Sequence, residues 1–318
     1  MRVLVTGGAG FIGSHLADKL VEKGDEVICL DNFDPYYNPN IKKKNIKHNL
    51  GKKNFKLVEA DVRDGKALKK VFEKNGIEKV VHLAAKAGVR PSIKDPLLFE
   101  DVNIRGTLNL LESCRKHGIE NFVFGSSSSV YGITEKVPFS EDDTLRPISP
   151  YGASKRSGEL LCHAYSSLYD IPVTCLRFFT VYGPRQRPDM AIHKFVKLID
   201  RGEKIQMYGN GTSKRDYTYI DDIVDGIMTA LEKKFVFEVF NLGNSKTVEL
   251  RRLISLIEEE LGKEAKIERL PDQPGDVPIT YADISKAKKL LNYSPKTRIE
   301  EGLAKFVEWY KDEGTMRE

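Results

Sequence analysis

The sequence predicts an α/β protein with a doubly wound parallel sheet and a smaller α+β region in its second half. Two observations and the length predict this class. Short β-rich runs alternate with amphipathic helical stretches in the first half, which is the pattern of a parallel sheet covered by helices on both faces. After Arg177, prolines and glycines separate short elements. The 318 residues correspond to roughly two domains.

The expected strands are short runs rich in β-branched and aromatic residues. They cover residues 3–6, 27–30, 55–59, 80–84, 122–125 and 173–177, and the run 237–242 adds one more strand to the same sheet. Amphipathic helices are expected at residues 13–23, 65–74, 97–116 and 153–169. Because the last strand returns from the second half, the predicted boundary is discontinuous. Residues 1–176 with about 220–244 form one domain, and residues 177–219 with 245–318 form the other.

Composition excludes several classes of protein. Hydrophobic residues make up 40% of the chain and charged residues 31%, which excludes a collagen, an acidic disordered chain and a disulfide-rich miniprotein. No apolar run approaches the roughly 18–20 residues that cross a bilayer. The first residues do not resemble a signal peptide. We therefore expect a cytoplasmic protein without membrane contact.

Cysteines and charge point to no metal and no nucleic acid. Cys29, Cys114, Cys162 and Cys175 form no C-x-x-C pair, so we expect free buried thiols rather than a metal site. A net charge of +5 does not indicate nucleic-acid binding, which needs clustering. The basic cluster at residues 42–48 is interpreted as a solvated face, with a phosphate or nucleic-acid patch as the alternative.

A glycine-rich turn joins the first strand to the first helix. Gly7, Gly10 and Gly13 satisfy the G-x-x-G-x-x-G spacing, which allows a tight turn and a close approach of the backbone to a pyrophosphate. Phe11 and Ile12 lie within this turn and are assigned to the cofactor site, and the N–H groups and dipole of the helix that follows favour phosphate. Since the motif lies between a strand and a helix, it predicts a Rossmann dinucleotide-binding domain.

Two acidic positions indicate which dinucleotide is bound. Asp31 ends the second strand, where a carboxylate accepts hydrogen bonds from the adenosine ribose and repels a 2′-phosphate. This favours NAD over NADP, and the alternative is a loop aspartate without a ligand. Asn32 follows Asp31 in the sequence and is assigned to the same cofactor site. Asp61 and Val62 follow the third strand and suit the adenine, with a helix-capping role for Asp61 as the alternative.

A phenol and an amine at helical spacing indicate acid–base chemistry. Tyr151 and Lys155 are four residues apart and share a helix face. A nearby ammonium lowers the pKa of a phenol, which is near 10 when free. Ser127 lies in a serine run after the fifth strand, at the sheet edge where such folds bind ligands.

With these motifs in place, the chain resembles the extended short-chain dehydrogenase/reductases of the nucleotide-sugar epimerase and dehydratase kind. It is most similar to UDP-glucuronate 4-epimerases and next to UDP-glucose 4-epimerases. The stretches that carry the likeness are residues 82–90, 125–132, 177–184, 187–190, 215–222 and 273–278. The likeness covers essentially the whole chain.

The resemblance implies a reaction in which the cofactor is not consumed. Tyr151 would remove the proton of the sugar C4 hydroxyl, and Ser127 would hydrogen-bond the same hydroxyl. Lys155 would lower the pKa of Tyr151 and hold the nicotinamide ribose. Hydride would pass from C4 to NAD, and the 4-keto sugar would rotate and take it back on its other face. The NADH must therefore remain bound throughout.

The resemblance also implies the residues around cofactor and substrate. The cofactor side adds Leu83, Ala84, Ala85 and Lys86. The UDP-sugar side comprises Ser127, Ser128, Ser129, Thr180, Arg187, Met190, Ala191, Gln206, Tyr208, Arg215, Gln273 and Asp276. Arg215 would bind the diphosphate, the strand containing Tyr208 would border the uracil, and Asp276 would contact the ribose or the sugar. The alternatives are a surface ion pair for Arg215, a core position for Tyr208, a turn residue for Asp276 and a solvated charge for Lys86.

Three features bear on the sugar. Arg187 with Thr180 matches the pair that binds the C5 carboxylate in uronate epimerases, and the alternative for Arg187 is a bond to a neighbouring loop. Gln273 stands where many relatives have a second diphosphate arginine, although glucuronate epimerases often share this change. Thr280 leaves space that does not exclude N-acetylated sugars. UDP-glucose or UDP-N-acetylglucosamine epimerisation is therefore the first alternative, followed by net dehydrogenation and by a non-catalytic NAD-binding sensor.

The serine run also bears on the type of reaction. Related dehydratases have an Asp-Glu pair where this chain has Ser128 and Ser129, and related decarboxylases have Glu at the second position. The resemblance therefore disfavours both dehydration and decarboxylation. The apolar stripes of helices 97–116 and 153–169 resemble those that pair in family dimers, so a homodimer through a helix bundle is expected.

Overall fold

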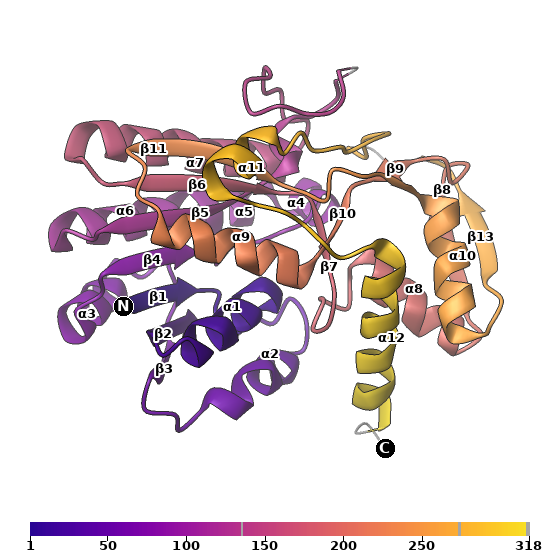
Figure 1. Ribbon diagram of the computed structural model, residues 1–318, viewed down its shortest axis with the longest axis horizontal. Helices are drawn as coiled ribbons and strands as arrows, with labels where there is room; N and C mark the ends of the chain where they lie inside the picture. Colours follow the sequence, from indigo (N-terminus) through magenta and orange to yellow (C-terminus); the bar gives the residue numbers. More distant parts are fainter. Residues whose placement is uncertain (135, 273–274, 316–318) are drawn as a thin grey trace.

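A computed structural model describes residues 1–134, 136–272 and 275–315. Its centre is a seven-stranded sheet with the order β11-β6-β5-β4-β1-β2-β3 (Figure 1). All neighbouring strands are parallel. The strands are β1 (Arg2–Thr6), β2 (Glu26–Asp31), β3 (Phe55–Glu59), β4 (Lys79–His82), β5 (Asn121–Ser127), β6 (Val173–Phe178) and β11 (Phe237–Leu242). The predicted doubly wound parallel sheet is confirmed, including the late strand 237–242.

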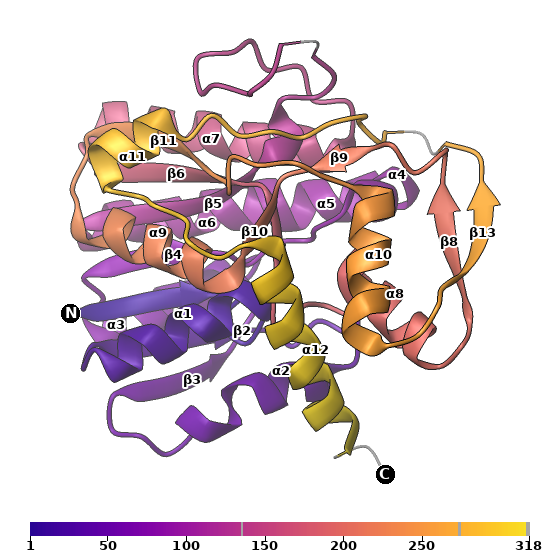
Figure 2. The same ribbon diagram turned by 45° about the vertical axis from the view of Figure 1, so that its right-hand side comes forward.

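Helices cover both faces of the sheet, as Figures 1 and 2 show. One face carries α1 (Phe11–Glu22) and α9 (Ile220–Glu232), with α2 (Pro39–Ile46) beside α1. The other carries α3 (Gly65–Asn75), α6 (Gly106–His117) and α7 (Pro150–Tyr169). Alternate strand residues fill the two apolar cores: Val3 and Val5 belong to one, and Leu4 belongs to the other. This alternation across a doubly covered sheet explains why the strands are nearly continuous apolar runs.

The start of α7 is set by local sequence. Ser149 caps the helix, because its hydroxyl oxygen accepts a hydrogen bond from the backbone N–H of Gly152 at 3.1 Å. Pro150 occupies the first helical position, where its missing N–H costs nothing. The cap places Tyr151 in the first turn of α7, close to the carboxyl edge of the sheet.

The prediction of one continuous helix over residues 97–116 is wrong, because this segment consists of three pieces. The pieces are α5 (Pro96–Glu100), a π-helical turn (Asp101–Arg105) and α6. The π-turn carries Asn103, whose side-chain amide donates to the carbonyl of Lys86 at 3.0 Å and to the hydroxyl of Ser154 at 2.9 Å. A π-turn holds one residue more than an α-helical turn. Here the wider turn directs the buried Asn103 amide to hydrogen-bond partners on two neighbouring segments.

The second half contributes short elements, as expected. Three two-stranded sheets pair β7 with β10, β8 with β13 and β9 with β12. The strands are β7 (Thr180–Tyr182), β8 (Lys204–Tyr208), β9 (Lys214–Arg215), β10 (Tyr217–Tyr219), β12 (Val248–Glu249) and β13 (Lys266–Leu270). The helices are α8 (Ala191–Asp200), α10 (Leu250–Leu261), α11 (Ser285–Leu291) and α12 (Ile299–Thr315), and α4 (Val89–Lys94) approaches this region from the first half (Figure 2).

The cysteines agree with the sequence analysis. All four are free and buried. Within the described residues, no group of His, Cys, Asp and Glu side chains could hold a metal ion. No helix in the described part of the chain has both the length and the apolar character that crossing a bilayer requires.

Candidate active site

The turn between β1 and α1 leaves no space for side chains at its glycines. Gly7 has a φ of +68°, which favours glycine. A Cβ atom at Gly13 would lie only 2.1 Å from the carbonyl oxygen of Gly7. Gly10 precedes α1, and no side chain caps the helix, so its first N–H groups, from Phe11 and Ile12 onward, suit phosphate oxygens. The turn therefore fits the pyrophosphate of a dinucleotide.

The segment after β4 lies against this turn. A Cβ atom at Gly7 would be 2.8 Å from the backbone nitrogen of Ala84 and 3.0 Å from the carbonyl carbon of Leu83. The expected cofactor segment 83–85 is thus brought beside the glycine turn. Lys86 forms an ion pair with Asp34 at 2.7 Å, with its side chain 15% exposed. It is not a solvated loop charge.

Asp31 is held by backbone hydrogen bonds. Its carboxylate accepts from the N–H of Ala9 at 3.1 Å and from that of Phe33 at 2.8 Å. Burial raises the pKa of Asp31, whereas Lys42, with its nitrogen 4.0 Å away, and the two backbone bonds lower it. Lys42 is itself buried, so the interpretation of the basic cluster as a solvated face is wrong at this residue. Burying an ammonium next to a carboxylate offsets part of the desolvation cost of both groups.

Asp61 lies beside Asn32, whose amide donates to its carboxylate at 2.8 Å. The Arg63 guanidinium also binds Asp61, and these bonds lower the pKa of its carboxyl to about 2. Asp64 caps α3, so the alternative that Asp61 caps the helix is wrong. The neighbouring Val62 is buried.

Ser127, Tyr151 and Lys155 meet at the carboxyl end of β5. Burial raises the pKa of Tyr151, while a hydrogen bond with Ser127 and the positive charge of Arg187 lower it. The Lys155 ammonium donates to the carbonyl of Gly125 at 2.7 Å, and burial lowers its pKa to about 8. In this structure the groups that favour the Tyr151 phenolate are Ser127 and Arg187, so the effect of Lys155 on Tyr151 stays a prediction. Ser128 and Ser129 follow in a half-buried 3-10 turn.

Sequence reasoning missed the buried ion pair beneath these residues. Glu159 lies one turn after Lys155 and accepts two hydrogen bonds from Arg177, at 2.8 Å and 3.0 Å. It also accepts one from the hydroxyl of Ser126, next to Ser127, at 2.7 Å. The pair therefore connects α7, β5 and β6. No local signal could have found it, because Glu159 and Arg177 are 18 residues apart and lie on different elements.

On the substrate side, Arg187 is held by Asp189. Its Nε and Nη2 atoms donate to the two carboxylate oxygens of Asp189 at 3.0 Å and 2.8 Å. Burial lowers the pKa of Arg187, whereas Asp189 and, to a smaller extent, Tyr36 and Tyr151 raise it; in turn, the charge of Arg187 favours the ionised form of Tyr151. Arg187 therefore lies near the phenol. Met190 precedes α8 and Ala191 begins it; Thr180 begins β7 and is half-buried.

Arg90 joins the predicted uracil and ribose residues. Its guanidinium carbon lies 4.1 Å from the centre of the Tyr208 ring, and its Nη2 atom lies 2.9 Å from a carboxylate oxygen of Asp276. Tyr208 and Asp276 are thus brought together, and Tyr208 is not a plain core residue. Sequence reasoning did not assign Arg90, because it lies on α4 and 186 residues from Asp276.

The remaining predicted substrate residues, Arg215, Gln206 and Gln273, have fewer described contacts. Arg215 donates to the carbonyl of Lys214 at 2.9 Å. Burial lowers the pKa of Arg215, and Tyr217 and Asp276 oppose this shift; its binding of the diphosphate stays a prediction. Gln206 accepts from the hydroxyl of Tyr208 at 3.3 Å. Gln273 lies outside the described residues.

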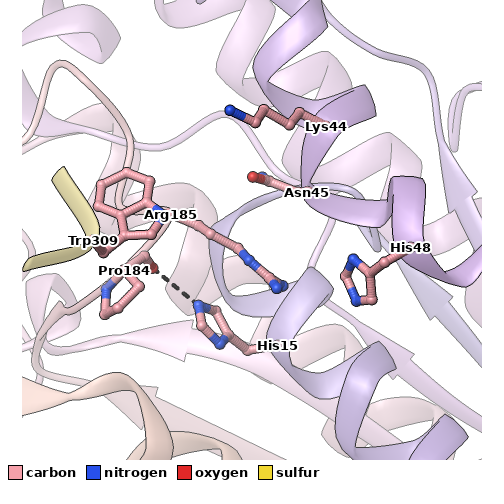
Figure 3. A pocket seen from close by; sticks show the side chains of 7 residues that line it. All are labelled: His15, Lys44, Asn45, His48, Pro184, Arg185 and Trp309. Atoms are coloured by element: carbon pink, nitrogen blue, oxygen red, sulfur yellow. Dashed lines mark hydrogen bonds between the residues drawn. The ribbon is translucent and has the colours of Figure 1, made fainter. Parts of the chain in front are cut away.

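A separate cavity of about 310 Å³ lies beside α1. Figure 3 shows its lining, to which α1, α2, the 3-10 turn after α2 (Lys47–Asn49), the segment after β7 and α12 contribute: His15, Lys44, Asn45, His48, Pro184, Arg185 and Trp309. None of the predicted site residues lines it. His15 hydrogen-bonds the Pro184 carbonyl at 2.9 Å, and burial lowers its pKa to about 4, so it is neutral at physiological pH.

Comparison with known proteins places this site in a family. The family described as GDP-mannose 4,6 dehydratase matches residues 4–306. The chain belongs to this family of short-chain dehydrogenase/reductase type. Solved structures similar to this chain include a UDP-glucuronic acid 4-epimerase and a dTDP-glucose 4,6-dehydratase, so the family alone does not decide the reaction.

Individual relatives are similar over nearly their whole length. The chain is 44% identical to a UDP-glucuronate 4-epimerase of Thermodesulfobacterium geofontis, covering 97% of this chain and 96% of the relative. It is 40% identical to the UDP-glucuronic acid 4-epimerase of Bacillus cereus, solved with UDP-glucuronic acid and NAD, with a TM-score of 0.94 and coverage of 98% and 99%. A UDP-glucose 4-epimerase of Thermotoga maritima, solved with UDP-glucose, is 36% identical with a TM-score of 0.91 and the same coverage.

Proposed function

We propose that the protein is an NAD-dependent UDP-sugar 4-epimerase that interconverts UDP-glucuronate and UDP-galacturonate. The observation that carries the proposal is the position of Arg187, a cation near the Tyr151 phenol on the substrate side. A carboxylate at sugar C5 would lie next to the reacting C4 and gains a charge-assisted partner there. The relatives that act on UDP-glucuronate support the same substrate.

NAD fits the dinucleotide end of the chain. The glycine turn admits the pyrophosphate, and the Asp31 carboxylate suits a free ribose hydroxyl better than a 2′-phosphate. When bound, NAD would supply a hydride acceptor, and Tyr151 and Lys155 are the residues proposed to hold its nicotinamide end. The side chains at Asn32, Asp61 and the 83–86 segment complete the proposed cofactor site.

The protein residues have distinct roles in the proposed reaction. Tyr151 holds the proton removed from the C4 hydroxyl, and Ser127 orients that hydroxyl. Burial raises the pKa of Tyr151, so positive charge is required to make it a base near neutral pH, and Arg187 supplies part of that charge. Lys155 binds the nicotinamide ribose. Ser128 and Ser129 provide no carboxylate that could expel a C6 hydroxyl, which argues against dehydration.

The division of the chain follows from these roles. We assign residues 1–176 with about 220–244 to the NAD-binding domain and residues 177–219 with 245–318 to the UDP-sugar domain. Arg215 would bind the diphosphate, and Tyr208 and Asp276 the uridine. Because Arg90 contacts both of the latter, the uridine site would include one side chain of the NAD-binding domain.

Two further proposals concern assembly and location. Leu108, Leu160 and Leu168 on α6 and α7 are 36%, 54% and 69% exposed, and an apolar face of this kind fits a homodimer through paired helices. Light scattering of the protein with and without Leu160→Glu tests this: loss of the dimer is expected, and a monomeric native protein contradicts it. The four free thiols fit a reducing compartment, the cytoplasm.

Incubation with UDP-glucuronate, UDP-glucose and UDP-N-acetylglucosamine tests the function. We expect UDP-galacturonate to form without accumulation of NADH. Arg187→Ala should reduce turnover of UDP-glucuronate by about 10- to 100-fold, the value of one hydrogen bond to a charged group, with a smaller effect on UDP-glucose. Equal turnover of UDP-glucose by the native protein would favour the alternative substrate, and accumulating NADH would indicate a net dehydrogenase.

A further inference from the structure

Residues 183–190, between β7 and α8, carry Arg187 and are called the arginine loop here. One flank of this loop is fixed to α1. The guanidinium of Arg185 lies 2.7 Å from a carboxylate oxygen of Asp18, and the carbonyl of Pro184 is hydrogen-bonded to His15. Figure 3 shows Pro184 and Arg185 facing α1 across the cavity described above.

The other flank is fixed by Asp189 and Tyr36. Asp189 takes two hydrogen bonds from Arg187 and a third from the Tyr36 hydroxyl, at 3.2 Å. The guanidinium carbon of Arg187 lies 5.7 Å from the centre of the Tyr36 ring. Arg187 is therefore held by a carboxylate along one edge and by an aromatic ring, which also attracts cations.

Tyr36 belongs to the segment after β2, on the cofactor side. The Lys86 nitrogen lies 5.6 Å from the same ring and binds Asp34 at 2.7 Å. Both Lys86 and Asp34 are neighbours of the proposed NAD site. Tyr36 thus lies between a cofactor-side cation and the substrate-side arginine, although it is 44% exposed and contributes little to the core.

This arrangement restricts the direction of Arg187. Asp189 accepts hydrogen bonds from the Nε and Nη2 atoms of Arg187. The Nη1 edge of the guanidinium is not paired with this carboxylate. Asp189 also neutralises part of the arginine charge, so its presence does not simply increase attraction for an anionic substrate. Its contribution is orientation: an arginine that is already held loses less freedom when a sugar carboxylate binds.

We propose that Asp189 and Tyr36 are positioning residues that aim Arg187 at the sugar, and that they act on substrate recognition only through Arg187. The proposal rests on the proposed function of Arg187 as the partner of the C5 carboxylate. By this proposal, the segment that contains Tyr36 takes part in sugar recognition, although it follows β2, whose last residue, Asp31, belongs to the proposed cofactor site.

Asp189→Asn and Tyr36→Phe test the proposal. Asparagine keeps the shape and removes the charge, and phenylalanine keeps the ring and removes the hydroxyl. We expect the KM for UDP-glucuronate to rise about tenfold in Asp189→Asn and about threefold in Tyr36→Phe, with kcat changed less, as for hydrogen bonds to charged groups. The KM for UDP-glucose should change less than about twofold, since it has no carboxylate to bind.

A double-mutant cycle separates positioning from a general structural effect. In an Arg187→Met background, Asp189→Asn should have no further effect on the KM for UDP-glucuronate. Effects that add, or that are equal for the two sugars, overturn the proposal. Asp200→Asn is the matched control, because Asp200 also binds a cation, Lys263, and a tyrosine hydroxyl, that of Tyr310, at the opposite end of α8 from Ala191. It should leave both KM values unchanged.

A binding measurement distinguishes failure of this inference from failure of the proposed function. If the native protein does not turn over UDP-glucuronate, the proposed function fails, and calorimetric titration with UDP-glucuronate and UDP-glucose still tests the positioning. A preference of the native protein for UDP-glucuronate that Asp189→Asn removes supports the inference. If Asp189→Asn retains the preference of the native protein for UDP-glucuronate, the inference is refuted. It is also refuted if the native protein binds the two UDP-sugars equally.

Discussion

The cofactor side and the substrate side of this site are built in different ways. The cofactor side is compact in sequence: the glycine turn, Asp31 and the 83–86 segment all follow neighbouring strands of one parallel sheet. The substrate side collects side chains from several short elements, and it borrows Arg90 from α4 and Tyr36 from the segment after β2. Backbone, glycines and side chains that follow adjacent strands form the first side, whereas long side chains from distant elements form the second. Cofactor binding should therefore be insensitive to the identity of the sugar, and sugar recognition should be easy to change.

The variant with the largest expected effect, Tyr151→Phe, tests whether the cofactor side and the substrate side meet at Tyr151. Tyr151→Phe should lower kcat by about a thousandfold, the upper range for loss of a general acid–base group, because no other described group occupies the phenol position. Binding of NADH, followed by fluorescence, should be unchanged. A variant with native turnover would refute the role of Tyr151, and one that has lost NADH binding would show that the two sides cannot be separated.

The second test concerns the cofactor side alone. Gly13→Ala should weaken NADH binding by about a hundredfold or more, since a Cβ atom 2.1 Å from the Gly7 carbonyl forces the turn apart. Gly65→Ala is the matched control, because no atom lies within 4 Å of a Cβ atom at that position. Fluorescence titration measures both variants. Equal affinities in the two variants would show that the turn does not hold the pyrophosphate.

The third test concerns the support of the substrate side. The Asp216 carboxylate, beside Arg215, accepts backbone hydrogen bonds from Asn244, Ser245 and Ala282 at 2.7–3.1 Å. Asp216→Ala should reduce the free energy of unfolding by about 2–4 kcal/mol, because one buried and two partly buried N–H groups lose their acceptor. Urea denaturation measures the change. A loss below about 0.5 kcal/mol, the usual range for surface substitutions, would contradict this support.

The smallest effect is the pH dependence of activity. Burial disfavours the Lys155 ammonium and lowers its pKa to about 8, so the group is charged below this pH and neutral above it. If the ammonium is needed, kcat/KM should fall about tenfold for each pH unit above 8. Lys155→Arg, whose guanidinium keeps its charge, should move this decline to higher pH in any protein that remains active. A native profile that is flat to pH 10 would contradict the requirement.

Sequence reasoning was strongest where spacing has a single physical meaning. Glycines at 7, 10 and 13 between a strand and a helix predicted the turn that the structure contains, and Tyr151 and Lys155 fell on one helix as their spacing required. It failed where neighbours far apart in the chain decide. Lys42 looked like a solvated lysine, but it is buried near Asp31, and the helix predicted at 97–116 contains a π-turn that directs Asn103 toward α7.

The sequence by itself determined the class of fold, the dinucleotide turn and the phenol–amine pair, because each depends on a local period or on steric limits within a few residues. Only the tertiary structure decided which charges meet. Glu159 with Arg177, Arg90 with Asp276, and Tyr36 with Asp189 are separated by 18, 186 and 153 residues. Such pairs form when packed strands and helices bring their ends to one edge of the sheet, and no local pattern in the chain records that meeting.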